Sequence, residues 1–321
     1  MAVAEGSDGG TALRLGTRGS LLATTQSGTV ADRIRSEAGV PVEMVIIRTT
    51  GDRIQDRPLA EIGGRGLFTR ELDEALLEDR IDLAVHSLKD LPTVLPDGLA
   101  LAAVPEREDS RDVLIAPKGS GLTFDSLPPG ARVGTGSLRR QALARGHRPD
   151  LTLAGIRGNL DTRLRKVDEG EYDAILLAAA GVRRLGWTDR ISEAMDPGGW
   201  LPAPGQGALA IVVREDDLER SRTWTAVLEH PPTRAAVDAE RSVLHTLEAG
   251  CQLPVGALGI PYGGGMRLRA VVASPDGARA VRAEASGSES DAWGLGMRVA
   301  ERLLEMGADR ILAGVRVPGH P

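Results

Sequence analysis

The sequence predicts an α/β fold with two lobes and a smaller α+β unit at the C-terminal end. Three observations predict it. Strand-like apolar runs alternate with amphipathic, helix-like stretches, the alternation restarts after a charged segment, and near the end it gives way to a long helix followed by short strands. With 321 residues, the chain is long enough for two or three domains.

The first alternating unit begins with an apolar strand at residues 12–15. The helix that follows carries Leu22, Val30 and Ile34 on one face. Ser20 stands just before this helix and is a candidate N-cap, because a serine hydroxyl can accept a hydrogen bond from the first helical turn. The segment therefore predicts strand, turn and helix in succession.

The same unit continues with a second strand, a glycine-rich loop, a helix and a third strand, expected at 42–50, 63–66, around Phe68, Leu72, Ala75 and Leu76, and at 81–85. This alternation favours a parallel, doubly wound sheet. In such sheets, ligands bind beyond the carboxyl ends of the strands. Four polar residues are expected there: Arg18, Ser20, Lys89 and Asp90.

A second unit follows the charged segment EREDSRD, with strands expected at 132–135, 151–154 and 174–177 and helices at 138–145 and 160–167. The segment 201–214 has the pattern of a Pro/Gly loop followed by a strand, and it is a candidate to cross back to the first unit. With the region near Pro105, it would make a hinge of two crossing segments. The expected division is lobe 1 at 12–107 and 207–229, and lobe 2 at 108–206.

The third unit is expected at 230–321. A helix with Ala236, Val243, Leu244 and Leu247 on one face is expected to end at Gly250, and strands are expected at 255–260, 268–273 and 280–285. The sequence Ser-Pro-Asp-Gly between the last two strands is a hairpin-type turn signal, and a final helix spans about 291–306. Cys251 should then lie on the loop just past the first helix.

Cys251 is the single cysteine of the chain. One thiol cannot form an internal disulfide, and one sulfur cannot build a zinc or iron–sulfur site. Two interpretations stay open at this point: an inert, buried hydrophobic residue, or a single point of attachment or reaction.

Composition excludes several classes of protein. The net charge of −6 and pI near 5.5 argue against a nucleic-acid or membrane-surface protein, because such proteins usually carry an excess of basic residues. No apolar run approaches the length of a membrane span, and the first residues lack the pattern of a secretory signal. The five histidines show no metal-ligand spacing. We expect a cytoplasmic protein without a metal.

Arginines recur at matching points of the predicted topology, beside strand ends or the first turns of helices, at Arg139, Arg140, Arg157, Arg163, Arg183 and Arg184. Helix N-termini together with guanidinium groups make carboxylate or phosphate sites. Any one of these arginines could instead be a solvated helix-face charge paired with a nearby acid. The glycine-rich strings match neither the dinucleotide fingerprint nor the P-loop, which disfavours nucleotide binding.

Eight strings in order resemble the porphobilinogen deaminase (hydroxymethylbilane synthase) family: TRGSLLATTQ, GGRGLF, AVHSLKDLP, VGTGSLRRQ, RGNLDTRLRK, AAAGVRRLG, LPAPGQGAL and GCQLPVG. The resemblance covers about residues 13–256. It implies a transferase of tetrapyrrole (porphyrin and heme) biosynthesis. Such an enzyme joins four porphobilinogen molecules head to tail, with loss of ammonia, onto a bound dipyrromethane primer, and then releases hydroxymethylbilane by hydrolysis.

The resemblance also assigns residues. It implies that Cys251 holds the dipyrromethane through a thioether and that Asp90 is the catalytic aspartate, which protonates the departing amine and stabilises the cation that forms. Further cofactor- and substrate-binding positions are implied at Arg18, Ser20, Lys89, Thr135, Ser137, Arg139, Arg140, Arg157, Gly158, Arg163, Arg184 and Gln206. The cations suit a growing chain of pyrroles, each with an acetate and a propionate. His86 is expected to pack or hydrogen-bond near its strand end.

The family architecture that the resemblance implies is two lobes like those of type 2 periplasmic binding proteins, with a third domain that carries the cofactor loop. A monomer is expected, and movement between the lobes is a hypothesis for how room is made for the product. Two alternatives remain. A solute-binding protein would explain the arginines but gives Cys251 and Asp90 no task, and a cysteine hydrolase lacks a convincing histidine partner.

Overall fold

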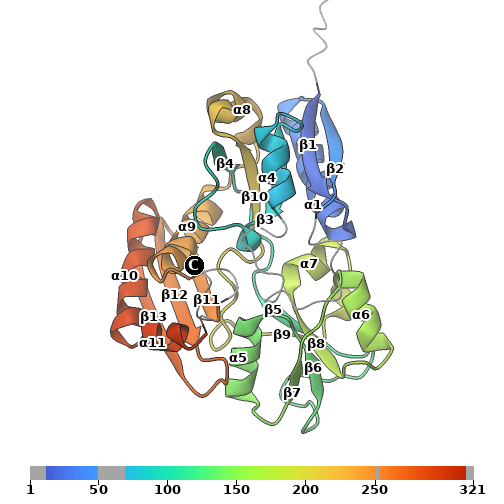
Figure 1. Cartoon of the computed structure of the whole chain (residues 1–321), viewed down its shortest axis with the longest axis vertical. Helices are drawn as coiled ribbons and strands as arrows, with labels where there is room; N and C mark the ends of the chain where they lie inside the picture. Colours follow the sequence, from blue (N-terminus) through green and yellow to red (C-terminus); the bar gives the residue numbers. More distant parts are fainter. Residues whose placement is uncertain (1–11, 50–68, 250–252, 316–321) are drawn as a thin grey trace, which may run out of the picture.

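The computed structural model describes residues 12–49, 69–249 and 253–315, which form three sheets in separate parts of the molecule (Figure 1). The first sheet has the strand order β2-β1-β3-β10-β4. Its strands are β1 (Leu13–Arg18), β2 (Val42–Ile47), β3 (Leu83–Ser87), β4 (Leu99–Ala103) and β10 (Leu209–Arg214). As expected from the sequence, the chain therefore returns to the first sheet after building the second.

Helices α1 (Leu21–Arg33), α4 (Arg70–Leu77) and α8 (Leu218–Thr225) accompany this sheet. Ser20 caps α1 as expected, since its hydroxyl accepts a hydrogen bond from the backbone N–H of Ala23 at 3.3 Å. Helix α4 buries Leu72, Ala75 and Leu76, the face that the sequence periodicity predicts. Phe68 and the glycine-rich loop 63–66 lie outside the described residues.

The second sheet has the order β7-β6-β8-β5-β9, shown in green at the lower right of Figure 1. Its elements are β5 (Asp112–Ile115), β6 (Arg132–Gly134), α5 (Leu138–His147), β7 (Thr152–Ala154), α6 (Leu160–Asp168), β8 (Ala174–Ala178), α7 (Ala179–Arg184) and β9 (Glu193–Ala194). Every helix and strand predicted for this unit is present. Strands β5 and β9 and helix α7 are additional.

The expectation of purely parallel sheets is wrong for one strand in each lobe. Strand β10 pairs antiparallel with β3 and β4, and β5 pairs antiparallel with β8 and β9. Both are the first strands after a crossing between lobes. Residue Leu209, the first of β10, pairs with Ser87, the last of β3, and Asp112 of β5 likewise pairs with Ala178 of β8. A chain that arrives from the other lobe enters the sheet at its carboxyl edge and must run backwards through it.

The third sheet, β11-β12-β13, is an antiparallel meander. Its part of the chain comprises α9 (Pro231–Thr246), β11 (Val255–Tyr262), β12 (Gly265–Ala273), β13 (Ala280–Ser288), α10 (Ala292–Glu305) and α11 (Ala308–Ala313). The described chain also contains the single helical turn Leu88–Asp90. Four further short helices lie at Ile34–Ala38, Thr188–Arg190, Glu215–Asp217 and Glu289–Asp291. None of the helices in the described ranges has the length and apolar character of a membrane span.

Helix α9 ends earlier than the sequence suggests. Its last residue is Thr246, and Glu248 takes the left-handed backbone conformation, with φ of 49°, that was expected at Gly250. The backbone N–H of Ala249 then donates to the carbonyl of Leu244 at 2.8 Å, which closes the helix end without a glycine. Gly250 and Cys251 lie outside the described residues.

A buried ion pair ties both crossing segments to the third part of the chain. The carboxylate of Glu240, on α9, is fully buried and accepts hydrogen bonds from Arg107 at 2.6 and 3.0 Å, from the backbone of Gly205 at 2.7 Å and from the backbone of Gly259 at 2.8 Å. Arg107 also donates to the carbonyl of Gln206 at 2.7 Å. Residues 107 and 205 belong to opposite crossings, so one carboxylate fixes both.

We expect Glu240→Gln to lower the free energy of unfolding by about 3–5 kcal/mol, because it leaves the buried Arg107 guanidinium without its counter-charge. Denaturant unfolding checks this. Glu169→Gln is the matched control, since Glu169 pairs with Arg165 on an exposed helix face and its loss should cost at most about 0.5 kcal/mol. Equal, small effects of the two substitutions would contradict the stabilising role of Glu240 at the two crossing segments.

Candidate functional site

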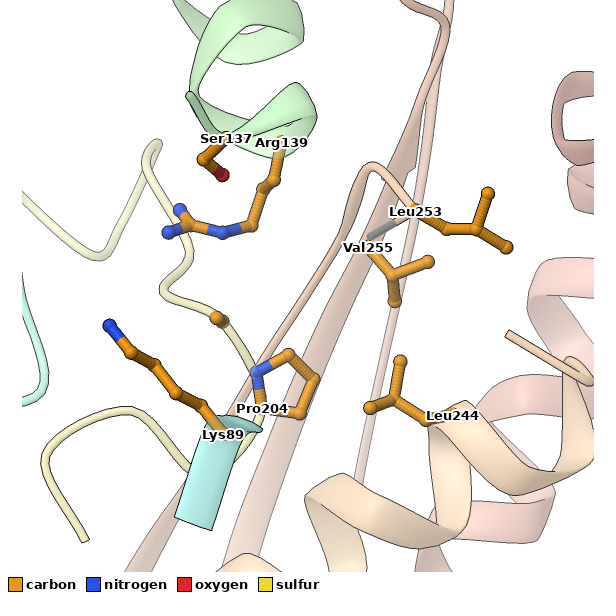
Figure 2. A pocket seen from close by; sticks show the side chains of 8 residues that line it. Lys89, Ser137, Arg139, Pro204, Leu244, Leu253 and Val255 are labelled. Atoms are coloured by element: carbon orange, nitrogen blue, oxygen red, sulfur yellow. The ribbon is translucent and has the colours of Figure 1, made fainter. Parts of the chain in front are cut away.

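A pocket lies where the three parts of the chain meet. It is lined by Lys89, Ser137, Arg139, Ala203, Pro204, Leu244, Leu253 and Val255. Figure 2 shows the Lys89 amine and the Arg139 guanidinium on one side of it, and Leu244, Leu253 and Val255 on the other. The pocket therefore offers positive charge to one side of a ligand and an apolar wall to the other.

Beneath the cationic side lies a buried carboxylate, Asp112, at the start of β5. It accepts hydrogen bonds from the guanidinium groups of Arg139 and Arg140, from the indole N–H of Trp200 at 2.8 Å and from the Gln206 amide at 2.8 Å. We call these five residues the Asp112 cluster. Asp112 and Gln206 are fully buried, and the other three side chains are at most 7 % exposed.

The charges of the Asp112 cluster do not cancel. Burial alone would raise the pKa of Asp112, but Arg139 and Arg140 hold it far below its usual range, so the carboxylate is ionised. One negative charge thus faces two guanidinium groups. Burial lowers the pKa of Arg140, and Asp112 opposes that effect. In the described chain the Nε of Arg139 is buried without a hydrogen-bond acceptor. The cluster keeps an excess of positive charge.

Lys89 extends this excess into the pocket. Its side chain comes from the turn Leu88–Asp90 at the carboxyl end of β3, and its Nζ lies 3.5 Å from the Gln206 side-chain oxygen. Burial lowers the pKa of Lys89 to about 8, and the nearby Asp90 opposes this shift. Among the described residues, Lys89 has no carboxylate within ion-pair distance, and a lysine whose charged form burial disfavours in this way suits an anionic ligand.

Asp90, the proposed catalytic residue, is exposed at the end of the same turn. Its charge acts on Lys89, Arg140 and Arg163, and it raises the pKa of each. The structure therefore places Asp90 among the cations that the sequence selected, with its carboxyl group open to solvent.

Arg163, on α6, and Arg157, in the turn before α6, lie close enough to Arg140 and to each other to interact electrostatically. Burial lowers the pKa of Arg163 to about 10, and the positive charges of Arg140 and Arg157 lower it further. The Nε of Arg163 donates to the carbonyl of Gly158 at 2.8 Å. Gly158 has φ of 104°, and a Cβ there would come within 2.8 Å of the Thr162 side chain, so the turn that presents Arg163 requires glycine.

The structure corrects the placement of Arg183 and Arg184. They occupy the last turn of α7 instead of the start of a helix, so the macrodipole there favours the cations themselves and offers no anion site. Arg184 donates to the carbonyl of Gly207 at 2.7 Å, and Arg183 pairs with Asp109 at 3.3 Å. Arg184 therefore links lobe 2 to the second crossing segment.

Three of the selected hydroxyl groups have structural partners. Ser20 caps α1, and the Ser137 hydroxyl caps α5 by accepting from the Arg140 backbone at 3.4 Å. Thr135 is buried, and its hydroxyl accepts from the Ser137 backbone at 3.2 Å. These hydrogen bonds position Arg140 and the end of β1, where Arg18 is the last residue.

Cys251 lies outside the described residues, but its neighbours in the sequence border the pocket. Leu253, two residues after it, lines the pocket, and Ala249, two residues before it, is buried in the core of the third part. The described residues contain no group of three or more His, Cys, Asp or Glu side chains arranged to hold a metal ion.

Two residues that organise this site were missed from the sequence, Asp112 and Glu240. Asp112 stands in the charged segment EREDSRD, where its neighbours suggest a solvated loop. Its apolar successors, Val113 to Ile115, were the available signal that a buried strand begins there.

Comparison with known protein families gives two matches. Residues 13–222 match the family model described as "Porphobilinogen deaminase, dipyromethane cofactor binding domain", and residues 235–305 match "Porphobilinogen deaminase, C-terminal domain". Together they span most of the chain.

Curated relatives match over nearly their whole length. The chain is 50 % identical over 301 residues to the porphobilinogen deaminase of Syntrophobacter fumaroxidans, covering 94 % of this chain and 96 % of that protein. It is 53 % identical over 306 residues to the porphobilinogen deaminase of Desulforudis audaxviator, covering 94 % and 97 %. A solved arginine-specific periplasmic binding protein of Salmonella typhimurium is more distant, at TM-score 0.40 and 16 % identity, covering 68 % of this chain and 91 % of that one.

The environment of Lys89 predicts a pH dependence of stability in the ligand-free protein. Between about pH 8 and the ordinary lysine value of 10.5, the unfolded chain binds a proton at Lys89 that the folded protein has lost. The free energy of unfolding should therefore gain a contribution that rises with pH in this window. We expect Lys89→Met to be more stable than wild type at pH 7, with a difference that shrinks from pH 8 to 10.5. Denaturant unfolding at a series of pH values measures it, and a constant difference would contradict the burial of a charged amine.

Proposed function

Because the chain belongs to the porphobilinogen deaminase family, we propose that the pocket between its three parts holds the dipyrromethane primer and the growing pyrrole chain. The protein is a transferase of tetrapyrrole synthesis, which condenses porphobilinogen and yields hydroxymethylbilane. The assignment of individual residues to this reaction is our proposal. The observation that carries it is the excess of positive charge at the buried Arg139 and Arg140 and the partly buried Lys89, which face the single carboxylate of Asp112.

The residues present fit a dipyrromethane. Each pyrrole ring carries an acetate and a propionate, so two linked rings bring several carboxylates on two flat rings joined by a methylene bridge. Arg140 is buried, and Lys89 and Arg163 are partly buried. Burial lowers the pKa of all three, and bound carboxylates would offset that cost. Leu244, Leu253 and Val255 supply the apolar wall against which the rings can pack.

Cys251 is the proposed attachment point, through a thioether. This is supported by the family match, by the position of Leu253 at the pocket and by the presence of a single cysteine in the chain. When bound, the dipyrromethane would supply the free pyrrole carbon to which the first porphobilinogen is joined, and each later porphobilinogen would join the terminal ring of the growing chain. The sulfur then serves as an anchor and takes no part in elongation.

Asp90 is the proposed acid–base residue. Each condensation forms one carbon–carbon bond, breaks the bond to the aminomethyl nitrogen, and removes one proton from a pyrrole carbon. A single carboxyl group that first gives a proton to the departing amine and then receives the ring proton balances the step. In its ionised form, the same group offsets the positive charge that develops on the substrate. The exposed carboxyl of Asp90, next to Lys89 on the turn Leu88–Asp90 and close enough to Arg140 and Arg163 to interact with them, suits both tasks.

The other selected residues have proposed binding or positioning roles. Arg18, Arg157 and Arg163 would bind carboxylates directly, and Arg139, Arg140 and Gln206 would act largely through the Asp112 cluster. Ser20, Thr135, Ser137, Gly158 and Arg184 would position these groups. We also propose the division into lobe 1 (12–107 and 207–229), lobe 2 (108–206) and a cofactor-bearing domain (230–321). A monomer is supported by a pocket assembled from three parts of one chain, and the cytoplasmic location stays a prediction.

Two variants test the proposal in one experiment. Wild-type protein should show, by intact mass, an adduct equal to two deaminated porphobilinogen units. Cys251→Ser should lack the adduct and the activity. Asp90→Asn should keep the adduct, because this substitution leaves the Cys251 anchor in place. Its turnover should fall about 10²- to 10⁴-fold, because the proton donor is gone.

Ser221→Ala is a matched control, since Ser221 is buried on α8 away from the pocket and should retain both adduct and activity. An unmodified wild-type protein that neither binds nor consumes porphobilinogen would defeat the proposal. An Asp90→Asn variant with wild-type turnover would remove Asp90 from the chemistry.

A further inference from the structure

His86 occupies an unusual place near the carboxyl end of β3. The strand lies between β1 and β10 in the first sheet, and the His86 side chain is 5 % exposed. Its Nε2 is buried and has no hydrogen-bond partner in the described structure. Buried polar atoms of native proteins are nearly always paired, so Nε2 needs a partner that the described chain does not supply.

The neighbour of His86 on the adjacent strand is Arg18. Strands β1 and β3 run parallel, and Gly16 pairs with Ala84. Arg18 and His86 stand two residues further along their strands, which places them on the same face of the sheet at its carboxyl edge. Their electrostatic interaction agrees with this, since the positive charge of Arg18 acts on His86.

His86 is a neutral imidazole in this setting. Burial lowers its pKa to about 4, and Arg18 lowers it further. One ring nitrogen of a neutral imidazole carries a hydrogen and can donate. Next to a cation, the ligand group best placed to accept that hydrogen is one that the cation also attracts, namely a carboxylate.

We propose that His86 is a substrate-binding residue, whose Nε2–H donates to the pyrrole side-chain carboxylate that Arg18 pairs with. The inference rests on the proposed function, in which Arg18 binds a carboxylate of porphobilinogen or of the growing chain. It adds a neutral, directional donor beside the charge of Arg18. Such a donor fixes the orientation of a carboxylate, while a guanidinium supplies most of the attraction.

A packing role makes the opposite prediction. If His86 only fills space, an apolar ring of similar size should fit at least as well, because it removes an unpaired polar atom from the interior. Stability would then rise or stay unchanged and substrate binding would not change. Substrate binding therefore separates the two roles, and the unfolding midpoint shows only that each variant is folded.

The test compares His86→Phe with His86→Gln in the holoenzyme. His86→Phe keeps a planar ring and removes the donor. It should raise KM for porphobilinogen about 10-fold or more, with kcat within about 2-fold and with an unfolding midpoint no lower than wild type. His86→Gln places an amide N–H close to the position of Nε2 and should recover most of the lost affinity. His86→Met repeats the deletion with a flexible apolar side chain should the phenylalanine variant fail to fold.

A KM within 2-fold of wild type in the folded Phe or Met variant would overturn the proposal, as would an equal rise in KM for the Gln variant. Arg18→Met separates this inference from the function on which it rests. If Arg18→Met raises KM and His86→Phe does not, the inference on His86 fails alone. If Arg18→Met leaves KM unchanged, the carboxylate assignment of the proposed function fails.

Discussion

The structure of the site depends on the pairing of one buried carboxylate, Asp112, with Arg139 and Arg140. Asp112 begins β5, directly after the first crossing between the lobes, and Gln206 reaches it from the second crossing. A buried, ionised carboxylate is tolerated only when it is paired and fully hydrogen-bonded. The two arginines, Trp200 and Gln206 must therefore converge on it, which brings β5, the start of α5 and both crossing segments to one point.

This constraint also explains the charge of the pocket. Two guanidinium groups share one carboxylate, and Lys89 lies beside them with its amine close to the Gln206 side chain. The surplus positive charge is held in place before any ligand arrives, so little reorganisation is needed on binding. Glu240, from the third part, also helps to position Lys89. Its carboxylate accepts a hydrogen bond from the backbone of Gly205, and Gly205 packs against Leu88 and the backbone of Lys89. The turn Leu88–Asp90, both crossing segments and the third part of the chain are thus mechanically connected.

Local sequence patterns predicted most of the fold, because they depend on neighbouring residues. The alternation of strands and helices, the N-cap at Ser20, the return of β10 and the hairpin turn that contains Gly277 all follow from such patterns. The antiparallel strands β5 and β10 could not be predicted in this way, since their direction depends on which edge of the sheet the chain enters.

Motif resemblance selected Lys89, Asp90, Arg140 and Arg163, which the structure does bring together. It could not identify Asp112 or Glu240, because the partners of Glu240, such as Arg107, are 133 residues away in the sequence. The resemblance also assigned Arg139 and Arg140 to ligand binding, whereas both guanidinium groups donate hydrogen bonds to Asp112.

The central claim is that the Asp112 cluster and Lys89 carry an excess of positive charge that binds the carboxylates of the pyrroles. A crystal structure of the loaded enzyme tests it most directly. The account predicts pyrrole carboxylate oxygens within about 3 Å of the Lys89 amine and of the Arg163 guanidinium, with the Asp112 pairs unchanged. Carboxylates that point to solvent, with Lys89 and Arg163 paired to acidic side chains of the protein, would contradict it.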